Sequence, residues 1–232
     1  EISECLVGSE MCIRDSSGRF ADVLAAASSN ANTNVGLMGY TFKYVAPLAG
    51  SLKYSVEDVA LAIGLMANAG IKGEQAGTAL RSTFTRLIKP PKEAADAMSK
   101  LGISVKNADG SVKPLNTTLA DLRKAFSKLS DSEKAEYASM MAGQEAMSGF
   151  LALVNASDDD FNKLSKAIRE SNGAAAGMAK TMNANLKGQL KQFQSVTESI
   201  GISIYDKFKK PLTKAFADVN GSLGDLNKSI TN

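Results

Sequence analysis

The chain of 232 residues contains no histidine and no tryptophan, and only two of its residues are cysteine. Without histidine, neither a Ser-His nor a Cys-His catalytic pair can form, and the usual zinc ligand sets are missing. Two thiols alone are too few to hold a metal ion. These absences predict a protein that is not an enzyme, with no catalytic residues, no metal ligands and no cofactor-binding residues.

Two motifs for phosphate binding and covalent catalysis are also missing. The chain has no Ser-x-x-Lys and no Gly-x-x-x-x-Gly-Lys-Ser/Thr sequence, and the glycine-rich stretch GAAAGM (173–178) lacks the strand and the lysine that a phosphate loop requires. A pair of catalytic carboxylates stays open, because one sequence does not show which acids meet. Nothing in the pattern, however, places two acids in an apolar cleft.

Aromatic residues make up only 6% of the chain. Because sheets favour β-branched and aromatic residues while Ala, Leu, Lys and Met favour helices, this composition predicts an all-α protein. The net charge is +3 and the bases are dispersed among acids, which does not predict a nucleic-acid site. The longest strongly apolar run without a charge, Val59 to Ile71, has 13 residues, fewer than the ~20 that cross a bilayer.

Both cysteines, Cys5 and Cys12, lie in the first 16 residues, EISECLVGSEMCIRDS. Leu6 to Ser16 resembles the translation of a transposase-type sequencing adapter, and the variable index upstream of the adapter accounts for the residues before it. We therefore expect residues 1–16 to be an adapter-derived artefact, and the native sequence, a fragment of a longer protein, to begin near Ser17. Excluding them removes one of 27 basic and four of 24 acidic residues, so the net charge rises from +3 to +6.

After this segment, apolar residues recur mostly at helical spacing, in stretches separated by polar, Gly or Pro turns. Several helix starts carry a Ser or Thr with an acid three residues later, which is typical of a capping box. These pairs are Ser55 with Asp58, Thr118 with Asp121, Ser130 with Glu133 and Ser157 with Asp160. The pattern predicts an elongated helical bundle.

One segment, GISVKNADGSVKPL (102–115), has a different pattern. Ile103 and Val105 alternate with polar residues, and residues 107–110 supply turn-forming side chains. We expect a small β-hairpin near residues 103–114.

Two groups of acids superficially suggest a metal site. Asn107, Asp109 and Gly110 stand at the third, fifth and sixth places of a calcium-binding EF-hand loop, but the twelfth place is Asn116 rather than glutamate, so calcium binding is not predicted. The acids at 158–160 begin a predicted helix, where negative charge is favourable against the helix dipole.

The last part of the chain, residues 173–232, carries a single long apolar stripe. Its 15 positions from Met178 to Ile230 span 52 residues in 14 steps, a mean spacing of about 3.7. This spacing predicts one long amphipathic helix, nearly straight or weakly right-handed, interrupted at Pro211. Such a stripe needs a partner helix to cover it.

Several blocks resemble the conserved region of phage tail tape measure proteins, the rulers of long-tailed bacteriophages and prophages. The most specific is NAGIKGEQAGTALR (68–81), and the resemblance covers essentially residues 17–232. The other blocks are FADVLAAAS (20–28), residues 50–60 with SLK inserted, LGI to LN (101–116) and GQEAMSGFLALV (143–154). The family has no catalytic residues in this region.

The resemblance implies a structural virion protein that determines tail length, serves as a scaffold for tail assembly and is released during DNA ejection. It implies as partners the tail tube protein, tail assembly chaperones, distal tail or baseplate proteins and further copies through the long helix. The implied location is the lumen of the virion tail, and the host cytoplasm during assembly, with membrane contact during ejection.

We thus expect three parts: residues 1–16, not native; 17–172, the helical conserved region with its hairpin at 103–114; and 173–232, a truncated ruler-type helix. Two alternatives belong to other classes. One is a membrane-active helical protein. The other is a generic coiled-coil interaction module, which should show a strict seven-residue repeat that this chain does not have.

Overall fold

Helix α3 (Val56–Asn68) is the most deeply buried element, with every residue from Asp58 to Ala67 buried. A helix that is apolar on all sides belongs inside a core. The computed structural model describes residues 17–185 and 190. Contacts divide the chain into a unit of residues 1–178 and a unit of residues 179–232, and the first contains the fold described below.

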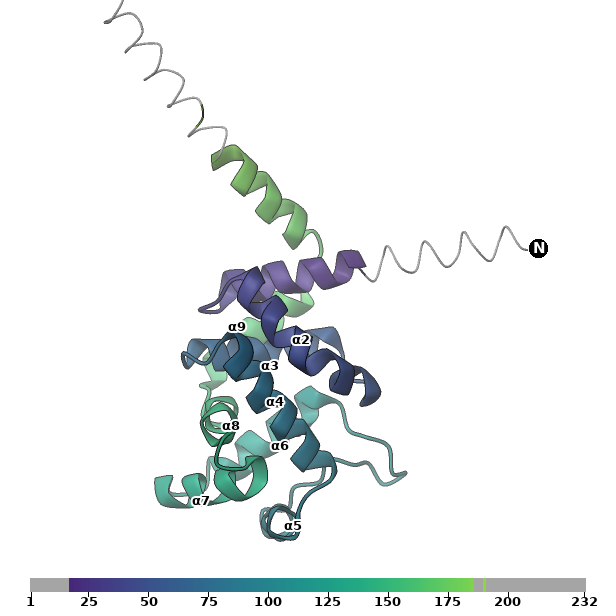
Figure 1. Cartoon of the computed structure of the whole chain (residues 1–232), viewed down its shortest axis with the longest axis vertical. Helices are drawn as coiled ribbons and strands as arrows, with labels where there is room; N and C mark the ends of the chain where they lie inside the picture. Colours follow the sequence, from purple (N-terminus) through teal and green to yellow (C-terminus); the bar gives the residue numbers. More distant parts are fainter. Residues whose placement is uncertain (1–16, 186–189, 191–232) are drawn as a thin grey trace, which may run out of the picture. The chain divides into compact units, whose positions relative to one another are not determined.

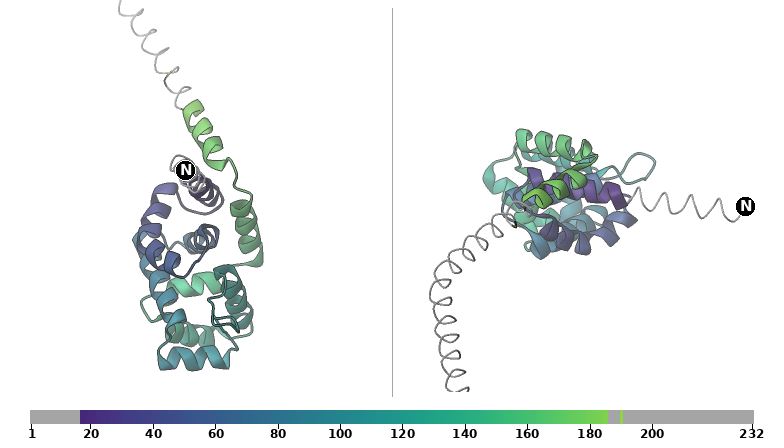
Figure 2. Two further views of the ribbon diagram at one scale, coloured as in Figure 1. Left: turned by 90° about the vertical axis from the view of Figure 1, so that its right-hand side faces the viewer. Right: turned by 90° about the horizontal axis from the view of Figure 1, so that it is seen from above.

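Helices α2, α4, α6, α8 and α9 contact α3 (Figure 1). Helix α2 packs along α4, α9 packs against α3, and α5 against α7, while α8 contacts α3, α4, α6 and α7. Helix 17–30 and α5 lie at opposite ends of this unit (Figures 1 and 2). The bounds are 17–30, α2 Val35–Ser51, α4 Gly73–Ile88, α5 Lys92–Lys100, α6 Leu115–Phe126, α7 Asp131–Ala142, α8 Met147–Val154 and α9 Asp158–Arg169.

Glycines inside helices mark the closest helix contacts. A Cβ on Gly77 of α4 would lie 2.8 Å from Tyr44 Cβ of α2, and one on Gly149 of α8 would lie 2.8 Å from Ala79 Cβ of α4. Carbon atoms in ordinary contact are about 3.5–4.0 Å apart. Glycine at these positions therefore lets the helix axes approach more closely than any side chain would allow.

Three of the four predicted helix caps are confirmed. The side chains of Ser55, Ser130 and Ser157 accept hydrogen bonds from backbone N–H groups three residues later. The prediction at Thr118 is wrong, because α6 already begins at Leu115 and Thr118 is a buried interior residue. A carboxylate from another helix accepts a backbone N–H at the start of α6, and this tertiary contact takes the place of the predicted cap.

The β-hairpin predicted near 103–114 is also wrong. Among the described residues this segment forms only an isolated antiparallel bridge, between Lys106 and Val112. The hydroxyl of Ser104 binds both the N–H and the carbonyl oxygen of Lys106, and Asp109 accepts from the N–H of Ser111. Two backbone bonds flank this bridge, from Asn107 N–H to Ser111 O and from Lys113 N–H to Val105 O. The pairing goes no further because the N–H of Ile103 binds Met98 O at the end of α5 and α6 begins at Leu115.

The all-α prediction is confirmed for the described part of the chain. The long amphipathic helix predicted over 173–232 lies largely outside the described residues, which contain helix at 174–185 and at residue 190. The segment 1–16 lies outside them as well. Of the helices that the structure describes, none combines the length and the apolar character needed to cross a membrane.

Candidate functional site

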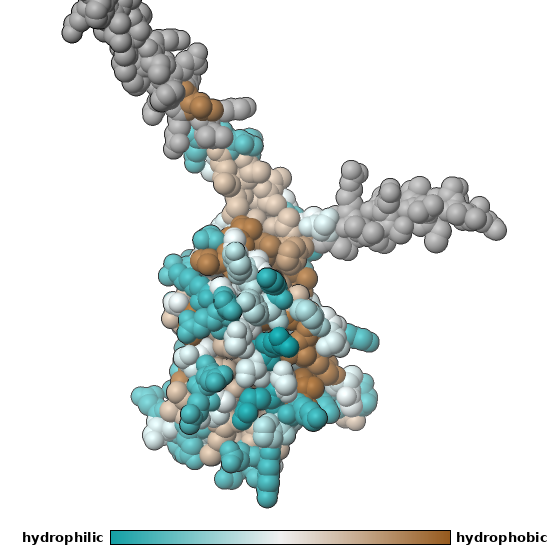
Figure 3. Space-filling model, viewed as in Figure 1, coloured by the Kyte–Doolittle hydropathy of each residue, from teal (hydrophilic) through white to brown (hydrophobic). Residues whose placement is uncertain are grey.

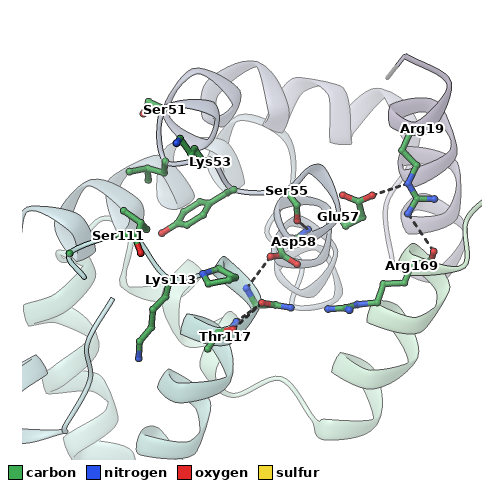
Figure 4. Close-up of a pocket in the computed structure, with 16 residues that line it drawn as sticks. Arg19, Ser51, Lys53, Ser55, Glu57, Asp58, Ser111, Lys113, Thr117 and Arg169 are labelled. Carbon is green, nitrogen blue, oxygen red and sulfur yellow. Dashed lines mark hydrogen bonds and ion pairs between the residues drawn. The ribbon is translucent and has the colours of Figure 1, made fainter. Parts of the chain in front are cut away.

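An open groove of about 1020 Å³ lies beside the first turn of α3 (Figure 4). One wall is the α2–α3 turn, residues 51–55, and the other is the segment from Gly110 to Thr117. Arg19 and Arg169 lie together at one end, and Arg169 extends towards the middle of the groove. We call this cavity the α3 groove.

Both carboxylates of the α3 groove are already engaged. Glu57 binds the Nε of Arg19 at 2.8 Å, and Asp58 accepts the backbone N–H of Asn116 at 3.3 Å. Partial burial raises the pKa of Glu57, but its own backbone N–H and the Arg19 guanidinium outweigh burial and leave it below the usual value. Asp58 lies in the first turn of α3 and also at the start of α6, where the helix dipoles favour a negative charge.

The turn between α2 and α3 contains an unusual backbone conformation. Lys53 has φ 57°, and no other described residue except glycine has a positive φ. The N–H of Lys53 binds Gly50 O and the N–H of Tyr54 binds Ala49 O, which is the Schellman motif that normally places glycine at this position. A side chain in the left-handed region costs roughly 1–2 kcal/mol.

Next to Lys53, the aromatic ring of Tyr54 is buried and packs edge-on against Phe84, with ring centroids 5.2 Å apart. Burial disfavours the charged phenolate and raises the pKa of Tyr54 to about 12. Tyr54 therefore lines the groove as a neutral phenol at any physiological pH.

The cations of the groove differ in their bonding. Arg19 is fully engaged, and Lys113 Nζ binds Asp121 at 3.0 Å. The side chains of Lys53 and Arg169 have no hydrogen bond or ion pair to any described residue. The α3 groove thus offers two cations without a hydrogen-bonded partner, of which Arg169 also helps to lower the pKa of Glu57, and no uncommitted carboxylate.

A second feature, which we call the Arg19–Asp22 clasp, binds the segment between α9 and the helix that begins at residue 174. The Arg19 Nη1 donates to Ser171 Oγ at 3.1 Å and to Asn172 Oδ1 at 2.8 Å. One turn further along the same helix, Asp22 accepts the N–H groups of Gly173 and Ala175, both at 2.9 Å.

The two charges of the clasp match the helix ends that they contact. Arg19 Nη2 lies 3.5 Å from Ile168 O and 3.4 Å from Arg169 O at the end of α9, while Asp22 caps the start of the next helix. The backbone N–H groups of Ala175 and Gly173 hold the pKa of Asp22 below its usual value, and Arg19 lowers it further. A cation thus meets a helix C-terminus and an anion a helix N-terminus.

The acids considered as metal ligands have other partners. Asp109 accepts the hydroxyl and the N–H of Ser111, and these bonds lower its pKa. Asp158 pairs with Arg123 at 2.5 Å, and the Arg123 guanidinium lies 4.5 Å from the centroid of the Phe161 ring. In the part of the chain that the structure describes, no three His, Cys, Asp or Glu side chains gather as a metal site would require.

Sequence reasoning did not find the α3 groove or the clasp. Arg19 and Asp22 stand three residues apart on a predicted helix, but their partners are about 150 residues away in sequence. The stretch GAAAGM (173–178), considered above as a phosphate loop, instead supplies two of the N–H groups that Asp22 accepts. The only sign of Lys53 in the sequence is that a lysine stands at the position where glycine usually ends a helix.

Comparison with known proteins identifies relatives from bacteriophages. The sequence model of the phage-related minor tail protein family matches residues 10–143. Over 93% of the chain, the sequence is 37% identical to the tape measure protein of Pneumococcus phage Dp-1, and over 86% it is 32% identical to the probable tape measure protein of Escherichia phage P2. A probable tape measure protein of Clostridium phage phiCD119 is 25% identical over 92% of the chain.

The chain spans only 18% of the Dp-1 protein, 25% of the P2 protein and 23% of the phiCD119 protein. No solved structure matches it significantly. The family match covers more than half of the chain, and all three relatives align over most of it. The chain therefore belongs to the phage-related minor tail protein family.

Proposed function

We propose that the chain is part of a phage tail tape measure protein, which determines tail length, serves as a scaffold for tail assembly and leaves the tail during DNA ejection. The observation that carries this proposal is the alignment of nearly the whole chain with proteins named for that role. The protein acts mechanically rather than as an enzyme, and needs no cofactor.

The organisation of the chain supports this proposal. The helices from 17–30 to α9 lie within residues 17–172, and a further helix begins at residue 174 with its first turn held by Asp22. We assign residues 173–232 to the start of the ruler. A helix advances ~1.5 Å per residue, so its length in residues translates directly into a distance along a tube. We assign residues 1–16 to adapter-derived sequence.

The partners that we propose are the tail tube protein, tail assembly chaperones, distal tail or baseplate proteins and further copies of the ruler helix. The proposed location is the tail lumen of the virion, after assembly in the host cytoplasm, with membrane contact during ejection. The apolar stripe from Met178 to Ile230 supports these partners, since a stripe of that length must be covered.

Tail length in a phage that carries the full-length gene tests the proposal. Helical residues inserted after Ala184, beyond the turn that Asp22 holds, should lengthen the tail by about 1.5 Å per residue. The matched control places the same number of residues between Ser127 and Lys128, two exposed residues of the α6–α7 turn, and should leave tail length unchanged. Equal tail lengths for the two insertions would contradict the ruler function.

A further inference from the structure

We propose that the α3 groove binds an acidic peptide segment of a partner protein. Four cations line the groove, whereas its two carboxylates, Glu57 and Asp58, are engaged with Arg19 and with the start of α6. The net charge of the lining is therefore positive, and Lys53 and Arg169 are its two cations without a hydrogen-bonded partner among the described residues. This inference does not depend on the tape measure function.

Lys53 is the residue that distinguishes the groove from an ordinary charged surface. Its backbone has φ 57° at the end of α2, where glycine would fit without strain. A lysine here makes the fold less stable and gains no bond within the described part of the chain. Strained residues of this kind cluster at ligand-binding sites, where the side chain is needed for binding.

The lining also indicates the chemistry of the occupant. Leu52, Tyr54, Val112 and Pro114 provide apolar surface next to the cations. An acidic peptide offers carboxylates to Lys53 and Arg169 and apolar side chains to the four residues Leu52, Tyr54, Val112 and Pro114.

A nucleic acid fits the groove less well. Of the groove's cations, only Lys53 and Arg169 lack a hydrogen-bonded partner in the described part of the chain, whereas a nucleic-acid interface neutralises several phosphates with clustered bases. On the face of the molecule shown in Figure 3, hydrophilic side chains are dispersed rather than gathered, and apolar residues lie mainly along the right-hand edge.

Fluorescence polarisation on the full chain tests the proposal, with a short labelled peptide in which Glu alternates with Leu and Ser. A peptide with Gln in place of Glu is the control. We expect the Glu peptide to bind at least about tenfold more tightly, because hydrogen bonds between charged groups are roughly twice as strong as neutral ones. Equal binding of the two peptides, or no binding of either, would overturn the proposal.

The variant K53G separates binding from folding. Glycine accepts the conformation of the turn, so K53G should raise Tm by roughly 2–4 °C and weaken binding of the Glu peptide about three- to tenfold. R169Q should weaken binding by a similar factor. K89Q removes an exposed positive charge outside the groove and should bind like the unmodified chain.

Two further results would overturn the proposal. One is a loss of binding in K89Q as large as that in K53G, because net charge alone would then explain the affinity. The other is tighter binding of duplex DNA than of the Glu peptide, with the same dependence on Lys53 and Arg169, because the groove would then be a phosphate site.

Discussion

Replacement of Gly77 by alanine tests whether the α2–α4 contact sets the geometry of the domain. The new Cβ would lie 2.8 Å from Tyr44 Cβ and 3.1 Å from the backbone oxygen of Thr41. Both atoms belong to the rigid part of α2, so no side-chain rotation removes the clash. The two helices must move apart instead.

The size of the effect follows from two opposing contributions. Overpacking a well-packed contact costs about 1–3 kcal/mol, while alanine in place of glycine inside a helix stabilises by about 1 kcal/mol. Gly39, an exposed residue of the second turn of α2, provides the matched control, because a Cβ there would meet nothing within 4 Å. G39A therefore keeps the favourable contribution without the clash.

Urea unfolding followed by far-ultraviolet circular dichroism measures both variants. We expect the free energy of unfolding of G77A to lie about 1–3 kcal/mol below that of G39A, and G39A to exceed the unmodified chain by up to about 1 kcal/mol. If G77A is as stable as G39A, the close approach of α2 and α4 is not what requires glycine, and the reasoning fails.

Other side chains make equally specific predictions. R86A should lower the free energy of unfolding by about 1–3 kcal/mol, because Arg86 donates to Met140 O and Met141 O at the end of α7; equal stability in urea would argue against this capping. D22N should speed hydrogen exchange at the amides of residues 173 and 175. The fold lowers the pKa of Asp22 below its unfolded value of 3.8. The stabilisation from its carboxylate is therefore complete above pH 3.8 and is lost as the pH falls through the folded pKa. Amide protection at residues 173 and 175 that acid does not change would contradict the cap. Tyr54 should ionise near pH 12 in the fold. Because burial raises this pKa, the free energy of unfolding should fall as the pH rises from the usual pKa of 10 towards 12. Tyrosinate absorbance measures the titration, and ionisation of all five tyrosines near pH 10 would refute the burial of Tyr54.

Local signals explain what could be predicted. Ser130 and Glu133 form a full capping box because both partners lie within one turn, so the sequence contains the whole interaction. The same holds for the helical spacing of apolar residues, which already predicted an all-α fold. The prediction of a β-hairpin was wrong because the alternation at Ile103 and Val105 does not reveal that the N–H of Ile103 binds the end of α5 and that α6 begins at Leu115.

The sequence by itself determined the helices, most of their caps and the family, because each depends on residues close together in the chain. Only the tertiary structure decided where helices cross, which acids are neutralised and where a groove opens. Asp22 and Ala175, or Asp58 and Asn116, are partners only because the packing of α3, α6 and α9 brings distant segments together. No local sequence pattern encodes such a pair, because the strength of its hydrogen bond depends on the distance between two atoms that only the folded chain brings together.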